Sequence, residues 1–437
     1  MRSDYDVGII GAGVLGVTIA YWLSRVSTDS IILIDKEEGV AVHTSSRNTG
    51  VLHRPFYLNP EKKKIFAGAA QKSFSLWAEL AKNYRLPWKQ VGTLEVAVDG
   101  SQIQTLNQYR EWALKNGMGE SEVEVLDSSE VRELEALVSC AGAIHSKTDT
   151  AVNYGNFTKC VFEFAAKNGV EFAGGQELIR AEEDGLGKVR LESRNRSGKV
   201  SKVSCSYMIN AAGGNSIDVA HKLGVGKQYT DLHFRGEYWV VESEFGDGIS
   251  RNIYSVARHK EFPFLDPHFI ARASGTREVG PNAVLVSGPN AYKGLSGSKS
   301  ELLEKIFERP KSPKLKLFTN AQFLSLVWEE WRSSISKKQM CDRVRHFIPS
   351  LDVGMLQTRG MAGVRSSVID DHGFVPEAII VEGKRSIHIL NYNSPGATGA
   401  PAYSAYIAKR IIENGFVQKG RLLNNGFSWD FDSASNL

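Results

Sequence analysis

A glycine-rich turn between two apolar runs constrains the fold of this chain more than any other feature. The first run, YDVGII, leads into Gly11, Gly13 and Gly16, and the second, IILI, ends at Asp35. Gly11 permits a tight strand-to-helix turn, Gly13 lets N–H groups at the positive end of a helix dipole approach a pyrophosphate, and Gly16 allows close helix packing. Asp35 follows by roughly 20 residues, where a carboxylate accepts hydrogen bonds from ribose hydroxyls. We therefore predict a βαβ unit that binds a dinucleotide.

The length and charge of the chain exclude some classes of protein. At 437 residues it is too long for one hydrophobic core, so two or three domains are expected. The 53 basic and 49 acidic residues nearly balance, and the net charge of +4 does not indicate a nucleic-acid partner.

The four cysteines bear on metal binding and on the redox compartment. Cys140, Cys160, Cys205 and Cys341 are widely scattered, without a C-x-x-C pair. This spacing predicts neither a metal site nor a disulfide framework, and favours a reducing, cytoplasmic compartment. The first strand begins almost at Met1, so we expect no signal peptide, and no run of 18 apolar residues could span a membrane. Peripheral contact with the inner face of a membrane stays open.

Periodicity places α/β segments at both ends of the chain and a strand-rich region in its middle. Helices are predicted over 61–84, 103–115, 156–167 and 401–414 and mainly over 298–349, and strands over 92–98, 169–203, 231–285 and 388–393. Glycines typical of nucleotide sites recur near residues 11, 213 and 396. We predict an α/β fold in which a discontinuous, Rossmann-like domain covers 1–88, 149–226 and 357–437. A second, α+β substrate-binding domain, built on a mostly antiparallel sheet, covers 89–148 and 227–356.

The number of dinucleotide fingerprints indicates where the electrons of a redox reaction would come from. There is one complete fingerprint, whereas a flavoprotein reduced by NAD(P)H usually needs a second nucleotide site. Electrons are therefore expected to come directly from a bound substrate. Composition does not decide between NAD and FAD.

The segment HTSSRNTGVLH, from His43 to His53, resembles the loop after the second strand in the D-amino-acid-oxidase superfamily of FAD oxidoreductases. Within it the match is to L-2-hydroxyglutarate dehydrogenases and oxidases, whose pattern is close to H-x-T-x-x-N-S-G-V-I-H. Further similar segments follow in order along the chain: GTLEVAV from Gly92, FRGEYW from Phe234, VGPNAVL from Val279, AGVRSS from Ala362 and IHILNYNSPGAT from Ile387. The resemblance implies FAD as cofactor and oxidation of (S)-2-hydroxyglutarate to 2-oxoglutarate.

Two loops are expected to contact the cofactor. The short side chains of Thr44, Ser45 and Ser46 could donate hydrogen bonds to a pyrophosphate, although a solvated turn is the alternative for them. Residues 48–50 would let the chain pass close to a planar ring. The turn at 394–398 precedes a helix whose first N–H groups can stabilise negative charge on a reduced flavin, although ordinary N-capping explains it too. We predict noncovalent FAD, because no cysteine lies near these loops, with a histidyl link through His43 as the alternative. The predicted cofactor-binding residues are Gly11, Gly13, Val14, Gly16, Asp35, Lys36, Thr44, Ser45, Ser46, Arg47, Asn48, Thr49, Gly50, Ala212, Gly213, Pro395, Gly396, Ala397 and Thr398.

Oxidation of an alcohol is helped by a general base, and two histidines are candidates. His53 follows the flavin loop in the position that the resemblance implies. His268 lies in FPFLDPHFIAR, where a strand would put Asp266, His268 and Arg272 on one face. Asp266 would then orient the imidazole. The alternative for either histidine is a partly buried ring satisfied by a neighbouring carbonyl.

A dicarboxylate substrate needs two cationic or multi-donor anchors, and arginine gives a bidentate match. The resemblance implies that Arg365 and Arg235 bind the carboxylates, and Arg272 is a third candidate for this role. Tyr57 and Asn391 are expected to make secondary contacts with the substrate. A structural ion pair between Arg235 and Glu237 is the alternative. Lysines 62–64 are expected to be a solvated surface.

Three departures from the family pattern leave the hydroxy acid open. Arg54-Pro55 replaces the usual Ala-Gly, which changes a pocket wall and adds a charge. Arg272 stands one place later in the sequence than the family arginine. The segment before it, SVARHKEFPF, lacks the proline-rich sequence of the family. The competing activities are an amine or imino-acid oxidase of the sarcosine or glycine type and a non-catalytic flavoprotein for assembly or redox sensing. Quinone, another acceptor or oxygen would reoxidise the flavin.

Overall fold

The computed structural model describes residues 2–258, 262, 266–294, 299–420 and 427–437. Its central sheet begins with β1 (Asp4–Ile10), which pairs in parallel with β2 (Ile31–Ile34) on one side and with β12 (Val200–Asn210) on the other. Ile9 lies opposite both Leu33 and Ile209, and all three are fully buried. β2, IILI, is a continuous apolar run, and the carboxyl-terminal halves of β1 and β12 are also buried, because both faces of the parallel sheet are covered there.

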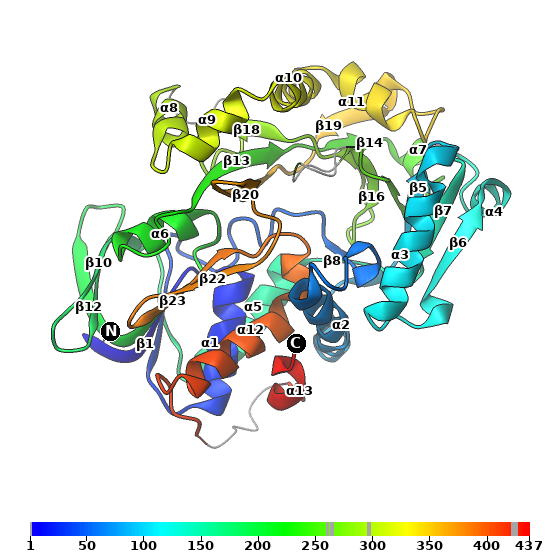
Figure 1. Cartoon of the computed structure of the whole chain (residues 1–437). Coiled ribbons are helices and arrows are strands. Elements are labelled where there is room, and N and C mark those ends of the chain that lie inside the picture. Colours follow the sequence, from blue (N-terminus) through cyan, green and yellow to red (C-terminus); the bar gives the residue numbers. More distant parts are fainter. Residues whose placement is uncertain (1, 259–261, 263–265, 295–298, 421–426) are drawn as a thin grey trace.

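The central sheet extends on both sides of these strands. β9 (Glu171–Ala173) adds in parallel to β2, and β23 (Ser386–Asn391) adds in parallel to β12. Antiparallel strands complete it: β10 (Glu177–Glu183), β11 (Val189–Arg194) and β22 (Ile379–Glu382). Residues near both ends of the chain therefore share one sheet, as Figure 1 shows.

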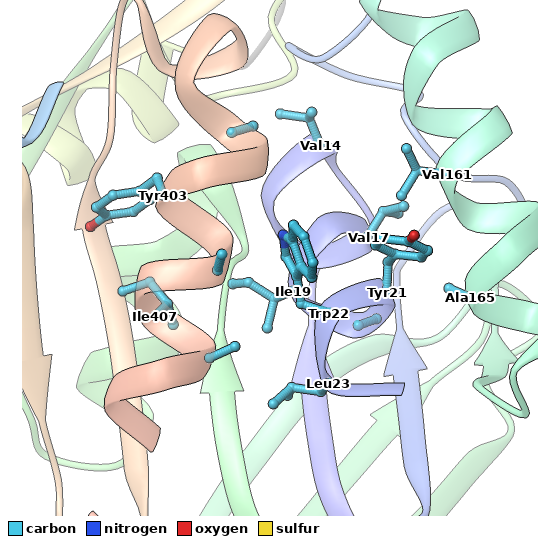
Figure 2. Close-up of a cluster of buried hydrophobic side chains, with 14 of the residues drawn as sticks. Val14, Val17, Ile19, Tyr21, Trp22, Leu23, Val161, Ala165, Tyr403 and Ile407 are labelled. Carbon is cyan, nitrogen blue, oxygen red and sulfur yellow. The ribbon is translucent and has the colours of Figure 1, made fainter. Parts of the chain in front are cut away.

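Helix α1 (Val14–Val26) is buried along most of its length. It lies between α5 (Tyr154–Lys167) and α12 (Gly396–Glu413), and Val161 faces it from α5 (Figure 2). On the other side the hydroxyls of Thr18 in α1 and Ser404 in α12 are 2.5 Å apart. The indole N–H of Trp22 donates to the carbonyl of Pro401 at 2.8 Å, which satisfies the polar atom of a buried side chain. Helices α2 (Lys64–Tyr84) and α13 (Phe431–Ser435) pack around α12, and α6 (Ser216–Lys222) follows β12.

A second large sheet has the order β19-β14-β17-β16-β15-β5-β7-β6, and its one parallel pair is β5 with β15. The strands are β5 (Thr93–Ala97), β6 (Val123–Asp127), β7 (Gly142–Ser146), β14 (Trp239–Val241), β15 (Asn252–Ser255), β16 (His268–Ala271), β17 (Arg277–Gly280) and β19 (Leu356–Arg359). Helices on this sheet are α3 (Ile103–Lys115), α4 (Ser128–Leu134) and α7 (Ser243–Gly246).

Two smaller sheets lie next to the cofactor-binding loops. Strands β18 (Val284–Val286), β13 (Thr230–Gly236), β20 (Gly363–Asp370) and β21 (Gly373–Phe374) form an antiparallel sheet. The other consists of β3 (Val51–Leu52), β8 (Thr150–Val152) and β4 (Trp88–Gln90). Helices α8 (Lys299–Phe307), α9 (Ser312–Phe318), α10 (Ala321–Ile335) and α11 (Lys337–Val344) lie on the side of the molecule remote from α1 and α12 (Figure 1).

The predicted α/β fold, with a Rossmann-like unit and a mostly antiparallel second sheet, is confirmed. Some boundaries differ. Helix α2 begins at Lys64 rather than at 61, and α12 begins at Gly396, directly after Pro395, rather than at 401. β20 pairs along its length with β13, although the predicted boundary at 357 assigns it to the nucleotide-binding part. The strand expected through FPFLDPHFIAR covers His268–Ala271, and its residues 263–265 lie outside the described part of the chain.

Within the described ranges, no helix is both long enough and apolar enough to cross a bilayer.

Candidate active site

Two adjoining cavities, of about 230 and 310 Å³, open at the carboxyl ends of the parallel strands β1, β2 and β12. The first is lined by residues beyond β2, including Asp35, Lys36 and Gln176. The second reaches the sheet of β13 and β20, with Phe234 and Arg365 in its wall. The residues that line both cavities are Gly13, Thr44, Ser45, Ala211, Gly213 and Gly214.

The glycine turn fits the pyrophosphate of a dinucleotide. Gly11 has a φ of 102°, and a Cβ there would lie 2.5 Å from the carbonyl oxygen of Ala211. Gly13 is the N-cap of α1 and lines the cavity, so the positive end of this helix lies at the cavity. The N–H of Val14 donates to Ser45 Oγ at 2.9 Å, which ties the helix to the loop after β2. Asp35 Oδ2 accepts from the N–H of Ala12 at 2.6 Å.

Most of the predicted flavin loop lines the second cavity. Thr44, Ser45, Arg47, Asn48 and Thr49 are in its wall. Two predicted residues are not. Ser46 donates inward to the carbonyl of Ala41, and Gly50 accepts from the N–H of Val152 at 2.7 Å. These two shape the loop instead of lining the cavity.

The start of α12 presents backbone donors to the second cavity. Pro395, Gly396, Ala397 and Thr398 line it, and the helix has no side-chain cap at Pro395. The hydroxyls of Thr398 and Tyr154 are 2.7 Å apart, which fixes this turn. The N-terminal N–H groups and the helix dipole therefore suit an anionic ring edge.

These cavities fit FAD. Asp35 and Lys36 lie where the adenosine half would bind, the shared glycines lie where the pyrophosphate would bind, and the larger cavity accepts the ring. The alternative of a covalent link through His43 is not supported, because its ring lines only the first cavity. Its Nδ1 lies 2.7 Å from the Tyr292 hydroxyl and its Nε2 lies 3.0 Å from Glu37 Oε1.

His53 lines the second cavity and is held by a buried carboxylate. Leu52 of β3 pairs with Thr150 of β8, so the residues just outside this pair, His53 and Asp149, meet. His53 Nδ1 lies 3.0 Å from Asp149 Oδ2, and the His53 side chain is 12% exposed. Asp149 is fully buried and also accepts from the hydroxyls of Thr93 and Ser146. A carboxylate on Nδ1 selects the tautomer in which Nε2 carries a lone pair and acts as the acceptor.

His268 occupies a different environment from the one predicted. It is fully buried, stacks on Tyr254 with ring centroids 4.0 Å apart, and is not in the cavity wall. Its Nδ1 lies 3.0 Å from the backbone carbonyl of Asp266, while the carboxylate of Asp266 binds Arg258 at 2.7 Å. The structure thus corrects the expectation that the Asp266 carboxylate orients this imidazole. The alternative, a buried histidine whose ring meets a carbonyl, describes its Nδ1, whereas its buried Nε2 has no hydrogen-bond partner among the described residues.

His268 should make the protein sensitive to acid. Burial lowers the pKa of His268 from 6.5 to about 3. Between these values the unfolded chain takes up a proton that the folded chain does not, so stability falls as the pH falls. From about pH 7 to about pH 5, we expect the native protein to lose about 1 to 2 kcal/mol more unfolding free energy than His268→Phe. Urea unfolding of both proteins at the two pH values checks this, and equal losses would contradict it.

Arg365 reaches the second cavity from β20. Burial lowers the pKa of this guanidinium. Tyr57 lies close by: it interacts electrostatically with Arg365, hydrogen-bonds the Ser394 side chain, and meets the His53 ring edge-on with centroids 5.9 Å apart. Tyr57 itself is not in the wall of the cavity, whereas its partner Ser394 is.

The structure places three other predicted substrate contacts elsewhere. Arg235 is buried in an ion pair with Glu237 at 2.9 Å, so the structural alternative holds for it. Arg272 binds Glu278 and donates to the carbonyl of Asn48, which supports the flavin loop from outside. Asn391 donates to the carbonyls of residues 375 and 377.

The guanidinium of Arg54, which was expected to add a charge to the pocket wall, does not line the cavity either. Arg54 is buried against Glu122, with Nη1 and Oε1 2.6 Å apart, and its guanidinium lies 4.3 Å from the centre of the Phe74 ring. Glu122 thus neutralises the positive charge that Arg54 introduces at this position.

Sequence reasoning missed two residues. Asp149 carries no motif, and only the pairing of β3 with β8 brings it to His53. Lys63, expected in a solvated surface, is half-buried at the start of α2. Burial and, second, the nearby Arg365 lower the pKa of Lys63. One turn later Phe66 stacks on Tyr392, which lines the second cavity, so this end of α2 borders the cavity.

Comparisons with known proteins agree with the site. The family model for FAD-dependent oxidoreductases (DAO) matches residues 6–410. The chain is 30% identical over 417 residues to the mitochondrial L-2-hydroxyglutarate dehydrogenase of Caenorhabditis elegans, which covers 93% of each protein. It is 29% identical over 406 residues to the L-2-hydroxyglutarate dehydrogenase of Indibacter alkaliphilus, covering 91% of this chain and 96% of that protein.

Solved structures share the fold. L-alpha-glycerophosphate oxidase from Mycoplasma pneumoniae, with FAD bound, superposes with a TM-score of 0.75 at 21% identity, covering 98% of this chain and all of that one. Glycine oxidase from Geobacillus kaustophilus gives 0.67 at 16% identity, covering 97% and 99%. The family model spans nearly the whole chain, and the two cavities offer the contacts that the cofactor requires. The chain therefore belongs to the family of FAD-dependent oxidoreductases.

Proposed function

We propose that this enzyme oxidises an L-2-hydroxy acid, with (S)-2-hydroxyglutarate, converted to 2-oxoglutarate, as the best candidate. The observation that carries the proposal is one cavity whose wall contains both His53, backed by Asp149, and Arg365. The L-2-hydroxyglutarate dehydrogenases that resemble the chain over nearly its full length support this substrate.

His53 is suited to remove the proton of a substrate hydroxyl. Its Nδ1–H donates to Asp149, so Nε2 is left as the acceptor, and the carboxylate stabilises the imidazolium that forms. The Tyr254 hydroxyl lies 3.4 Å from Nε2. A substrate hydroxyl would take the place of this long contact when it donates its proton to Nε2. When bound, FAD supplies the hydride acceptor, N5 of its ring. The protein contributes the base, the orientation of the substrate and the donors at the start of α12.

Arg365, in the cavity wall, is suited to bind one carboxylate of a dicarboxylic acid, and Lys63, which is outside the wall but interacts electrostatically with Arg365, is the candidate for the second. Both are cations whose charge is disfavoured by burial, which the lowered pKa values of the two groups reflect. A carboxylate between or beside them would offset that cost and pair bidentately with the guanidinium. A substrate with a single carboxylate would leave one cation uncompensated, so the pair favours a dicarboxylate.

Lys63→Gln is expected to raise the KM for (S)-2-hydroxyglutarate about tenfold, with little change in kcat, because a half-buried charge pair contributes roughly 1 kcal/mol or more to binding. The KM for a 2-hydroxy acid with one carboxylate should change much less. Steady-state kinetics with both substrates checks this. Lys62→Gln removes an exposed neighbouring charge and is the control. Equal effects of Lys63→Gln on the two substrates would contradict the assignment.

Anaerobic mixing of the holoenzyme with a panel of 2-hydroxy acids and amino acids tests the proposed function. Bleaching of the flavin by (S)-2-hydroxyglutarate and not by its mirror image is the expected result. Bleaching by glycine, sarcosine or another amine alone would instead identify an amine oxidase, and no bleaching at all would favour a non-catalytic flavoprotein. Reoxidation of the reduced enzyme by oxygen or by a soluble quinone then identifies the class of electron acceptor.

A further inference from the structure

Helix α10 carries an apolar stripe on a face that the described part of the protein leaves exposed. Leu324, Trp328, Trp331 and Ile335 are 44%, 59%, 40% and 65% exposed. Their spacing of four, three and four residues puts them within an arc of about 60° on one face of the helix. The two indole rings stack with centroids 5.1 Å apart, so the stripe has an aromatic centre.

The stripe is not the face that holds α10 in place. On its other side Phe323 and Leu326 are buried against β13 and β18, in one cluster with Phe234 and Ala283. Glu330 accepts from the N–H of Ala283 at 2.8 Å, which fixes the helix on the sheet. α10 therefore has two apolar faces, and one of them faces away from the protein.

Uncompensated cations accompany the stripe. Arg332 on α10 and Lys338 at the start of α11 are exposed, and neither forms an ion pair within the described ranges. The acids of α10 are already paired, since Glu329 and Glu330 lie 3.6 and 2.7 Å from nitrogens of Arg343. Among the described residues, Arg332 and Lys338 therefore leave unneutralised positive charge beside the stripe.

We propose that this face of α10 docks on an anionic lipid bilayer. Tryptophan favours the headgroup level of a membrane, and cations beside an apolar helix face attract acidic lipids by about 1 kcal/mol each. A second copy of the chain fits less well, because the exposed parts of the four side chains amount to roughly 400 Å². Two copies would bury about twice that area, less than the roughly 1,200 Å² typical of a stable interface.

The docked orientation would put the flavin cavity beneath the membrane-facing layer. Phe234 and Ala283 line that cavity and also contact the buried face of α10. One helix and one sheet would therefore separate the lipid surface from the cavity (Figure 1). The inference does not depend on the identity of the substrate.

Sedimentation of the holoenzyme with vesicles tests the proposal. The probes are vesicles of phosphatidylcholine containing about one third phosphatidylglycerol, and vesicles of phosphatidylcholine alone. We expect binding at least about tenfold stronger to the anionic vesicles, weakened by salt. Trp328→Ser with Trp331→Ser should weaken it about tenfold or more, and Arg332→Gln with Lys338→Gln should remove most of the preference for anionic lipid.

Leu186→Ser is the matched control, because Leu186 is 85% exposed in the turn between β10 and β11, far from α10. FAD content and thermal unfolding of each variant establish that it is folded. The proposal is overturned if the native protein does not bind anionic vesicles, or if the tryptophan variant binds them as well as Leu186→Ser does. A lipid-free dimer that the tryptophan variant converts to a monomer would assign the stripe to a second copy instead.

Discussion

Replacing His53 with asparagine should slow reduction of the flavin by (S)-2-hydroxyglutarate about 10²- to 10⁴-fold at neutral pH, because the substrate hydroxyl loses its general base. The asparagine keeps a polar group near Asp149 but cannot take up the proton. Anaerobic stopped-flow absorbance measures the rate constant, normalised to bound FAD. Substrate affinity should change much less than the rate.

Two further variants separate the chemical role of His53 from a structural one. Asp149→Asn should lower the rate constant substantially while the apparent Kd for substrate is retained, because it removes the charge that stabilises the imidazolium and selects its tautomer. His268→Asn should leave the rate constant of the folded holoenzyme unchanged, because that ring lies outside the cavity. A His53 variant within about tenfold of the native rate would contradict the assignment of the base.

Arg365→Lys should raise the apparent Kd for (S)-2-hydroxyglutarate about 10- to 100-fold. The lysine keeps the positive charge but loses the planar fork, and a charge-assisted hydrogen bond contributes about 1.5 to 3 kcal/mol. The measurement is the dependence of the rate of flavin reduction on substrate concentration.

Arg235→Lys is the matched control for Arg365→Lys. It makes the same chemical change on the neighbouring strand β13, but in an ion pair with Glu237 outside the cavity. We expect it to lower the thermal stability and to leave the apparent Kd nearly unchanged. If Arg365→Lys leaves substrate affinity intact, the carboxylate assignment of Arg365 is wrong.

Local patterns predicted the nucleotide-binding part of the fold well. The glycine turn, the apolar runs around it and the second strand ending at Asp35 form β1, α1 and β2 as expected. These elements depend on short-range sterics and on strands buried on both faces, which leave a clear signal. The start of α12 was less well placed, because Gly396 and Thr398 suggest a loop, although they form the first turn of the helix.

The candidate site was predicted in part. The loop from Thr44 to Thr49 and the helix start at Pro395 line the cavities, whereas Ser46 and Gly50 shape the loop from outside. A residue type and its neighbours in sequence do not reveal whether a side chain is already paired. Arg235 and Arg365 therefore looked equivalent in sequence, and only one of them lines the cavity.

The sequence by itself determined that this chain binds a dinucleotide and, by resemblance, belongs with the FAD-dependent oxidoreductases. The tertiary structure alone decided which histidine meets a carboxylate and which is stacked in the core. His53 and Asp149 are separated by 96 residues and meet through the pairing of β3 with β8. Such contacts depend on strand register and on competition among nearby charges, which short stretches of sequence do not encode.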